Sequence, residues 1–141
     1  MSKTTKPAGI GSVTIVNGKH FGWVGMKGKY WDENFMRNGR VYIGRSSKAL
    51  KLEESPLANP FKVKQEGRKG CINKFRRLLW EDVKSYRETK FSTERLDAAF
   101  NLADMVKLGG DIELVCHCAP EGCHGSVIKN FIYWVIKENI H

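Results

Sequence analysis

The stretch that decides the fold is IELVCHCAPEGCHGSVIKNFIYWVIKEN, residues 112–139. Its apolar first part, Ile112 to Cys118, predicts a buried β-strand. The part from Gly125 to Asn139 predicts a helix. This helix is apolar on nearly every side, so we expect it to be deeply buried or packed at an interface. A buried strand that leads into such a helix is typical of a layered α/β fold.

The residues upstream predict two more helices and one more buried strand. Within residues 71–89, apolar side chains recur at steps of three and four, as in a helix with one buried face. A second helix is expected to begin after Ser92, a good N-cap residue, and to end at Gly109 and Gly110. The segment RVYIGR, residues 40–45, predicts a strand that lies beside residues 112–116 and ends in a glycine turn.

The beginning of the chain predicts a leader and a hairpin. Residues 1–11 are polar and contain Pro and Gly, so we expect a flexible leader. Asn17-Gly18 favours a β-hairpin formed by residues 12–16 and 20–24. The expected fold is therefore a single small α/β domain over residues 12–141. It should have a central, at least partly parallel sheet, about three packed helices and an N-terminal β-hairpin extension.

Composition and charge exclude several classes of protein. The 141 residues are 41% hydrophobic and carry a net charge of +9, so the chain has enough apolar residues for a core and is not intrinsically disordered. It lacks an apolar run of spanning length and a secretory signal, so no membrane association is expected. We expect a cytoplasmic protein with reduced cysteines, located in the host cytoplasm if a phage encodes it. The basic charge, concentrated before residue 92, favours an anionic partner.

A cysteine–histidine cluster between the last strand and the last helix is the most specific feature, and it allows several interpretations. Cys116, Cys118, Cys123 and His124 are soft ligands that could together hold a zinc ion. Alternatively, Cys123 is a nucleophile that His124 and the start of the helix activate, which would make both residues catalytic. A structural role as buried, unreactive side chains is a further alternative.

A phosphate-binding interpretation of the same turn is the one we favour. Backbone N–H groups at Gly125 and Ser126 and the Ser126 hydroxyl would bind the anion, while Cys118 would shape the pocket. Gly44 and Arg45 should emerge at the same sheet edge, where Arg45 could bind a phosphate. Asn59, in Asn59-Pro60-Phe61, would bind the ligand or simply form an Asx-turn.

Several of these segments together resemble a known family. They are VYIGR (41–45), SPLANPF (55–61), FR (75–76), CHCAP (116–120) and CHG (123–125). They resemble a small domain-of-unknown-function family of bacteria and phages with the pattern V-Y-I-G-R, G-N-P-F and C-W-C-x-P-x-x-C-H-G. The resemblance covers about residues 40–135 and implies a compact α/β domain with these motifs in one pocket, but no established activity. Ala58 and His117 depart from the pattern, which usually has Gly and Trp there.

We therefore expect the chain to bind a phosphorylated, nucleotide-like ligand in a pocket formed by the Gly-Arg turn, the Asn-Pro-Phe loop and the cluster. In a phage setting, this ligand could be a host signalling nucleotide. One alternative is a cysteine- or zinc-dependent enzyme that acts on a nucleotide or nucleoside. Another is a basic nucleic-acid-binding accessory protein, because residues 1–51 contain ten Lys and Arg residues but only two Asp and Glu. The apolar last helix also makes a homo-oligomer a hypothesis to test.

Overall fold

A three-stranded parallel sheet forms one side of the molecule. The computed structural model describes residues 4–18, 39–48, 54–117 and 123–140. The strands are β1 (Val13–Asn17), β2 (Arg40–Tyr42) and β3 (Ile112–Cys116). Their order is β1-β3-β2, so the last strand lies in the middle. Both neighbours pair with β3 in parallel, with Val13 opposite Ile112 and Val41 opposite Leu114. The expected α/β fold with a parallel sheet is confirmed.

The N-terminal strand is an integral part of this sheet. The sequence predicts β1 as the first arm of a hairpin. In the structure, β1 pairs with β3 along its whole length and is therefore a strand of the central sheet. The other arm, residues 20–24, lies outside the described residues. Just before β1, Ile10 packs against the core and the Gly11 N–H donates to the Val106 carbonyl at 2.8 Å. These two residues of the expected leader therefore contact the folded core.

Within the described ranges, four helices accompany the sheet. They are α3 (Val63–Glu66), α4 (Arg68–Thr89), α5 (Glu94–Lys107) and α6 (Gly125–Glu138). The three long helices agree with the sequence prediction to within a few residues, whereas α3 has four residues and was not expected. None of the helices in the described ranges is both long and apolar enough to cross a membrane.

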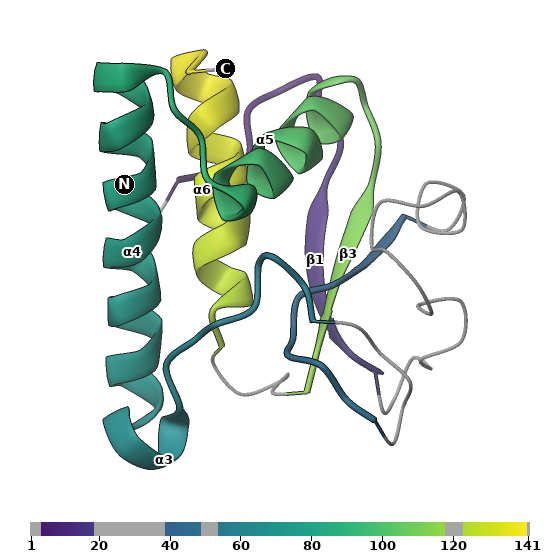
Figure 1. Cartoon of the computed structure of the whole chain (residues 1–141). Coiled ribbons are helices and arrows are strands. Elements are labelled where there is room, and N and C mark those ends of the chain that lie inside the picture. The colour runs from purple at the N-terminus through teal and green to yellow at the C-terminus, as the bar shows by residue number, and fades with distance from the viewer. Residues whose placement is uncertain (1–3, 19–38, 49–53, 118–122, 141) are drawn as a thin grey trace.

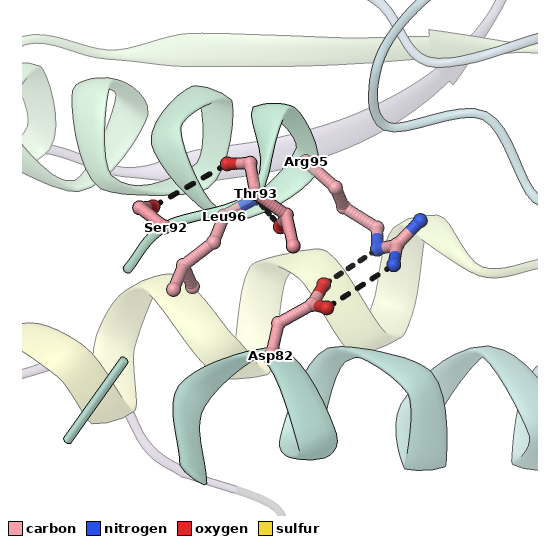
Figure 2. Close-up of polar contacts among 5 residues, drawn as sticks. All are labelled: Asp82, Ser92, Thr93, Arg95 and Leu96. Atoms are coloured by element: carbon pink, nitrogen blue, oxygen red, sulfur yellow. Dashed lines mark hydrogen bonds and ion pairs between the residues drawn. The ribbon is translucent and has the colours of Figure 1, made fainter. Parts of the chain in front are cut away.

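The N-cap of α5 is Thr93, one residue later than predicted. Thr93 has an extended backbone, and its side-chain oxygen accepts the Leu96 N–H at 3.0 Å (Figure 2). The Ser92 hydroxyl instead donates to the Thr93 carbonyl at 3.3 Å. Ser and Thr are both good caps, so composition alone could not distinguish the two neighbours.

The helices are layered on the sheet, with α6 between α4 and the strands (Figure 1). Seven residues of α6 are buried, among them Phe131 and Ile132. The Phe131 ring stacks on Phe100 of α5, with the ring centroids 6.3 Å apart. The apolar surface of α6 is therefore largely used within one chain. α4 is the outermost helix, and a bidentate ion pair between Asp82 and Arg95 connects it to α5 (Figure 2).

Candidate functional site

A pocket of about 570 Å³ lies at the carboxyl ends of β2 and β3. This edge is where open parallel sheets usually bind ligands, because the loops that follow the strands diverge there. The segments after β2, the Asn-Pro-Phe loop, the beginning of α3, and the ends of the cysteine–histidine cluster form its wall. The lining residues are Tyr42, Gly44, Arg45, Ser46, Ser47, Asn59, Phe61, Lys62, Val63, Lys64, Cys116, His117 and His124.

Arg45 connects the two loops that form the pocket. Its Nε donates to the Asn59 carbonyl at 3.0 Å, and its Nη2 donates to the Phe61 carbonyl at 2.9 Å. These bonds use two of the five N–H donors of a guanidinium group. The side chain is exposed, so its charge and remaining donors lie at the mouth of the pocket. Arg45 therefore has a structural role that the sequence did not indicate, and it keeps the capacity to bind an anion.

Asn59 lines the pocket and also organises its loop. The side-chain oxygen accepts the Phe61 N–H at 3.0 Å, which is the Asx-turn considered from the sequence. The side-chain nitrogen donates to the Cys71 carbonyl at 3.2 Å and so attaches the loop to α4. The oxygen and the nitrogen of the Asn59 side chain thus both bond to backbone groups. These contacts support a role for Asn59 in positioning Phe61.

Tyr42 and His117 form the part of the pocket that the sequence did not reveal. The Tyr42 hydroxyl donates to the Arg45 carbonyl at 2.6 Å and lies 3.0 Å from Nε2 of His117. Desolvation by burial raises the pKa of Tyr42, and the charges of Cys116 and Glu54 raise it further. Tyr42 therefore keeps its proton at neutral pH and can act as a donor.

Gly44 allows Tyr42 to take this position. A Cβ atom on Gly44 would clash with the hydroxyl and ring carbons of the Tyr42 side chain. The glycine of the Gly-Arg turn is therefore required for the close approach of the ring, which in turn holds the Arg45 carbonyl. Gly44 also lines the pocket, and its predicted role in ligand binding stays a prediction.

Cys116 and Cys123 face each other beneath the pocket. Their sulfur atoms are 3.5 Å apart, and the Gly125 N–H donates to the Cys123 sulfur at 3.3 Å. Their side chains are only 2% and 6% exposed, which hinders any attack by Cys123 on a ligand. Among the described residues, no group of three or more His, Cys, Asp or Glu residues could hold a metal ion. Cys118 lies outside those residues, so the four-ligand zinc prediction and the predicted role of Cys118 stay untested.

His124 is buried between β2 and α4. Its Nε2 lies 2.8 Å from the Ile43 carbonyl, and its ring contacts the Phe75 ring edge-on at a centroid distance of 4.9 Å. A carbonyl oxygen only accepts, so Nε2 carries the proton in this contact. This nitrogen thus holds the last helix against β2 and does not point at Cys123 as a catalytic base.

The beginning of α6 satisfies its own polar groups. The Ser126 hydroxyl and its N–H both donate to the Cys123 carbonyl, at 3.0 and 3.2 Å. Gly125 is buried, and a Cβ there would lie 3.1 to 3.3 Å from Ile43, Cys123 and Ile15. Neither residue lines the pocket in the described part of the chain. Gly125 and Ser126 thus pack and cap the beginning of α6 in this structure, and their predicted role in phosphate binding stays a prediction.

Among the described residues that line the pocket, the charged side chains, counting Lys, Arg, Asp and Glu, are all basic. Arg45, Lys62 and Lys64 line it, and none of its described lining residues is Asp or Glu. Glu66, the carboxylate of α3, is paired with Lys74 at 2.6 Å, whereas Glu54 lies outside the lining but acts on Tyr42 by its charge. Lys74 also lies 5.5 Å above the Phe61 ring, which adds a further cation beside this loop. The lysines were missed because α3 is too short to give a periodic pattern.

The chain matches the family model described as a domain of unknown function (DUF4326) over residues 26–134, and it belongs to this family. The match confirms the expectation of a domain-of-unknown-function family. It begins upstream of residue 40, the start expected from the motifs, so part of the segment before β2 is included in the domain. No curated protein and no solved structure matches the chain.

Proposed function

We propose that this member of the DUF4326 family binds a phosphorylated, nucleotide-like ligand in the pocket at the carboxyl ends of β2 and β3. The observation that carries the proposal is the lining of the pocket, which has three cations, two aromatic rings and no carboxylate among its described residues. A volume of about 570 Å³ is also within the usual range for small-molecule sites.

The lining residues suggest how such a ligand would be held. Arg45, Lys62 and Lys64 would bind the phosphate, because charge-assisted hydrogen bonds to phosphate oxygens are stronger than neutral ones. The hydroxyl groups of Ser46 and Ser47 would add neutral donors. The Phe61 ring would contact the planar, less polar part of the ligand, since base–aromatic stacking is favourable for every base.

Isothermal titration calorimetry with nucleoside 5′-monophosphates and the matching nucleosides tests this proposal. We expect nucleotides to bind and nucleosides to bind at least tenfold more weakly, because the cations recognise the phosphate. Arg45→Ala should weaken binding by about 1.5–3 kcal/mol, the range for hydrogen bonds to charged groups. Equal affinity for nucleotides and nucleosides, or the absence of binding by both, would overturn the proposal.

Two lysine variants separate ligand binding from loop structure. Lys64→Gln removes an exposed charge from the pocket and should weaken nucleotide binding without lowering the melting temperature. Lys107→Gln is the matched control, because Lys107 is also exposed but lies at the end of α5. The same loss of affinity in both variants would show a general charge effect and would contradict a specific phosphate site.

A further inference from the structure

One face of α4 carries a row of mostly basic side chains. The row consists of Lys69, Asn73, Arg76, Arg77, Trp80, Lys84 and Arg87, spaced by three or four residues along this 22-residue helix. Residues with this spacing share one face of a helix. The core-facing residues of α4 are different ones, such as Phe75, Leu79 and Val83, which are fully buried. α4 is also the outermost helix, with α6 between it and the strands (Figure 1).

The row contains five cations and no carboxylate. The exposed pair between Lys84 and Glu81, 3.3 Å apart, is of a type that contributes little binding energy. Arg76 donates to Asn73 at 2.9 Å, a neutral partner that leaves its charge in place. The outward residues of α5 contrast with this row, since Glu94, Asp97 and Asp104 are exposed there. α4 also exposes Glu81 and Glu88 beside the row, but its seven Lys and Arg residues outnumber its three Asp and Glu residues, so basic charge is concentrated on this helix.

The middle of the row is hollowed and contains an aromatic ring. Asn73, Arg76, Arg77 and Trp80 line a depression of about 350 Å³. Trp80 is half-buried, and its ring meets Trp134 of α6 edge-on at 5.9 Å, which fixes its orientation. Arg87 adds its guanidinium group 5.7 Å above the Trp134 ring. The guanidinium groups of Arg76 and Arg77 and the amide of Asn73 are suited to bind phosphates. The oriented indole ring of Trp80 is suited to stack on an unpaired base.

We propose that this face of α4 binds single-stranded nucleic acid through its phosphate backbone, with an unpaired base stacked on Trp80. The row from Lys69 to Arg87 spans roughly 27 Å at about 1.5 Å per residue, so its cations reach several successive phosphates. The surface is separate from the pocket at the strand ends. An acidic protein segment is the competing partner, but it would not explain the aromatic hollow.

Fluorescence anisotropy with a labelled oligonucleotide of about 15 nucleotides tests the proposal. Binding is measured between about 50 and 200 mM salt. For about four phosphate contacts on a single strand, the slope of log affinity against log salt should be close to −3. The double variant Arg77→Gln/Lys84→Gln should flatten this slope by about 1.4 and weaken binding at least tenfold at low salt. Trp80→Leu should weaken binding about tenfold but leave the slope unchanged, because stacking does not release counterions.

The matched control is Lys107→Gln/Lys137→Gln, which removes two exposed lysines at the ends of α5 and α6. This control should change the affinity for the oligonucleotide less than twofold. The melting temperature of each variant is measured to check that the variant is folded. The proposal is overturned if the oligonucleotide does not bind or if the control loses as much affinity as the α4 variant. It is also overturned if a polyglutamate peptide competes as well as unlabelled oligonucleotide. Lys64→Gln, which tests the pocket, should leave this affinity unchanged, so the two proposals fail separately.

Discussion

Tyr42 and His117 share a hydrogen bond whose direction is fixed by a third group. The Tyr42 hydroxyl lies 3.0 Å from Nε2 of His117 and donates its hydrogen to the Arg45 carbonyl at 2.6 Å. The hydroxyl has one hydrogen and a carbonyl oxygen only accepts, so His117 must donate from Nε2. The ends of β2 and β3 are thus joined by a directed chain from His117 through Tyr42 to Arg45, which holds the Gly-Arg turn in place.

The first prediction concerns this chain. Tyr42→Phe removes the hydroxyl but keeps the ring, so it should lower the free energy of unfolding by about 1–2 kcal/mol. Long-range ¹⁵N–¹H NMR of the imidazole rings should show the Nε2–H tautomer of neutral His117 in the parent chain and a loss of this preference in Tyr42→Phe. An Nδ1–H tautomer in the parent chain would contradict the hydrogen-bond direction.

The sequence predicted the three strands and the three long helices because each has a strong local pattern. The apolar strand at 112–116 and the apolar helix after Gly125 are both present. Parallel pairing of β2 with β3 then brings Arg45 to the same sheet edge as Cys116. The parallel pairing of β1 was not predicted, because Asn17-Gly18 gives a local hairpin signal whereas β1 pairs with residues nearly 100 positions away.

The candidate site was less predictable because its contacts depend on register. Tyr42 meets His117 because Tyr42 is opposite Val115 in the pairing of β2 with β3, which no local pattern encodes. Asn59 was weighed as a ligand or a turn residue, and only the position of the Phe61 N–H shows the turn. Ser126 looked suited to an anion, but its hydroxyl bonds to a carbonyl in its own helical turn.

The second prediction concerns Gly125, where α6 packs closely against the sheet. A Cβ would lie 3.1 Å from Ile43 Cδ1 and 3.2 Å from Cys123 Sγ, which is tighter than ordinary contact. Gly125→Ala should therefore destabilise the fold by about 1–3 kcal/mol, measured by urea unfolding. The matched control is Gly70→Ala in α4, where the new Cβ meets only Glu66 Cβ, at 3.6 Å. This control should stabilise the chain by about 0.5–1 kcal/mol, and a similar response at both sites would refute the packing argument.

The third prediction concerns the ion pair between α4 and α5. Asp82 and Arg95 bond at 2.7 and 3.2 Å, and their side chains are only 8% and 20% exposed (Figure 2). Arg95→Leu leaves the Asp82 carboxylate buried without its partner and should cost roughly 3 kcal/mol in unfolding experiments. Asp82→Leu/Arg95→Leu should recover most of that loss. Glu81→Gln, which removes an exposed pair with Lys84, should change stability by less than about 0.5 kcal/mol. No recovery in the double variant would show that the loss has another cause.

The fourth prediction concerns pH. Oδ1 of Asp111 accepts hydrogen bonds from the Ser12 hydroxyl and from the Ser12 N–H, each at 3.0 Å. These bonds, the hydroxyl first, lower the pKa of Asp111 below its ordinary value of 3.8. A carboxyl group whose pKa is lower in the folded state stabilises the fold above its unfolded pKa, and this contribution disappears as the pH falls through the folded pKa.

Ser12→Ala removes the hydroxyl that contributes most to this effect. It should lower the melting temperature at pH 7, and the difference from the parent chain should shrink as the pH falls below about 4. Scanning calorimetry from pH 7 to pH 2 measures this. Thr14→Ala, at an exposed position of β1 two residues further on, is the control. If the difference in melting temperature between Ser12→Ala and the parent chain instead grows as the pH falls, the stabilising contribution does not come from ionised Asp111.

The fifth prediction concerns the cysteines and decides between binding and covalent catalysis. Cys71, Cys116 and Cys123 are 2%, 2% and 6% exposed, and none of these three forms a disulfide. Burial should protect all three from iodoacetamide near pH 7, so that mass spectrometry of peptides detects their alkylation only when the protein is unfolded. Cys123, whose sulfur accepts the Gly125 N–H at the beginning of α6, is the residue that the enzyme hypothesis makes the nucleophile. Labelling of Cys123 well before Cys71 would contradict the protection and support the enzyme hypothesis, because an activated, accessible thiolate is what a nucleophile requires.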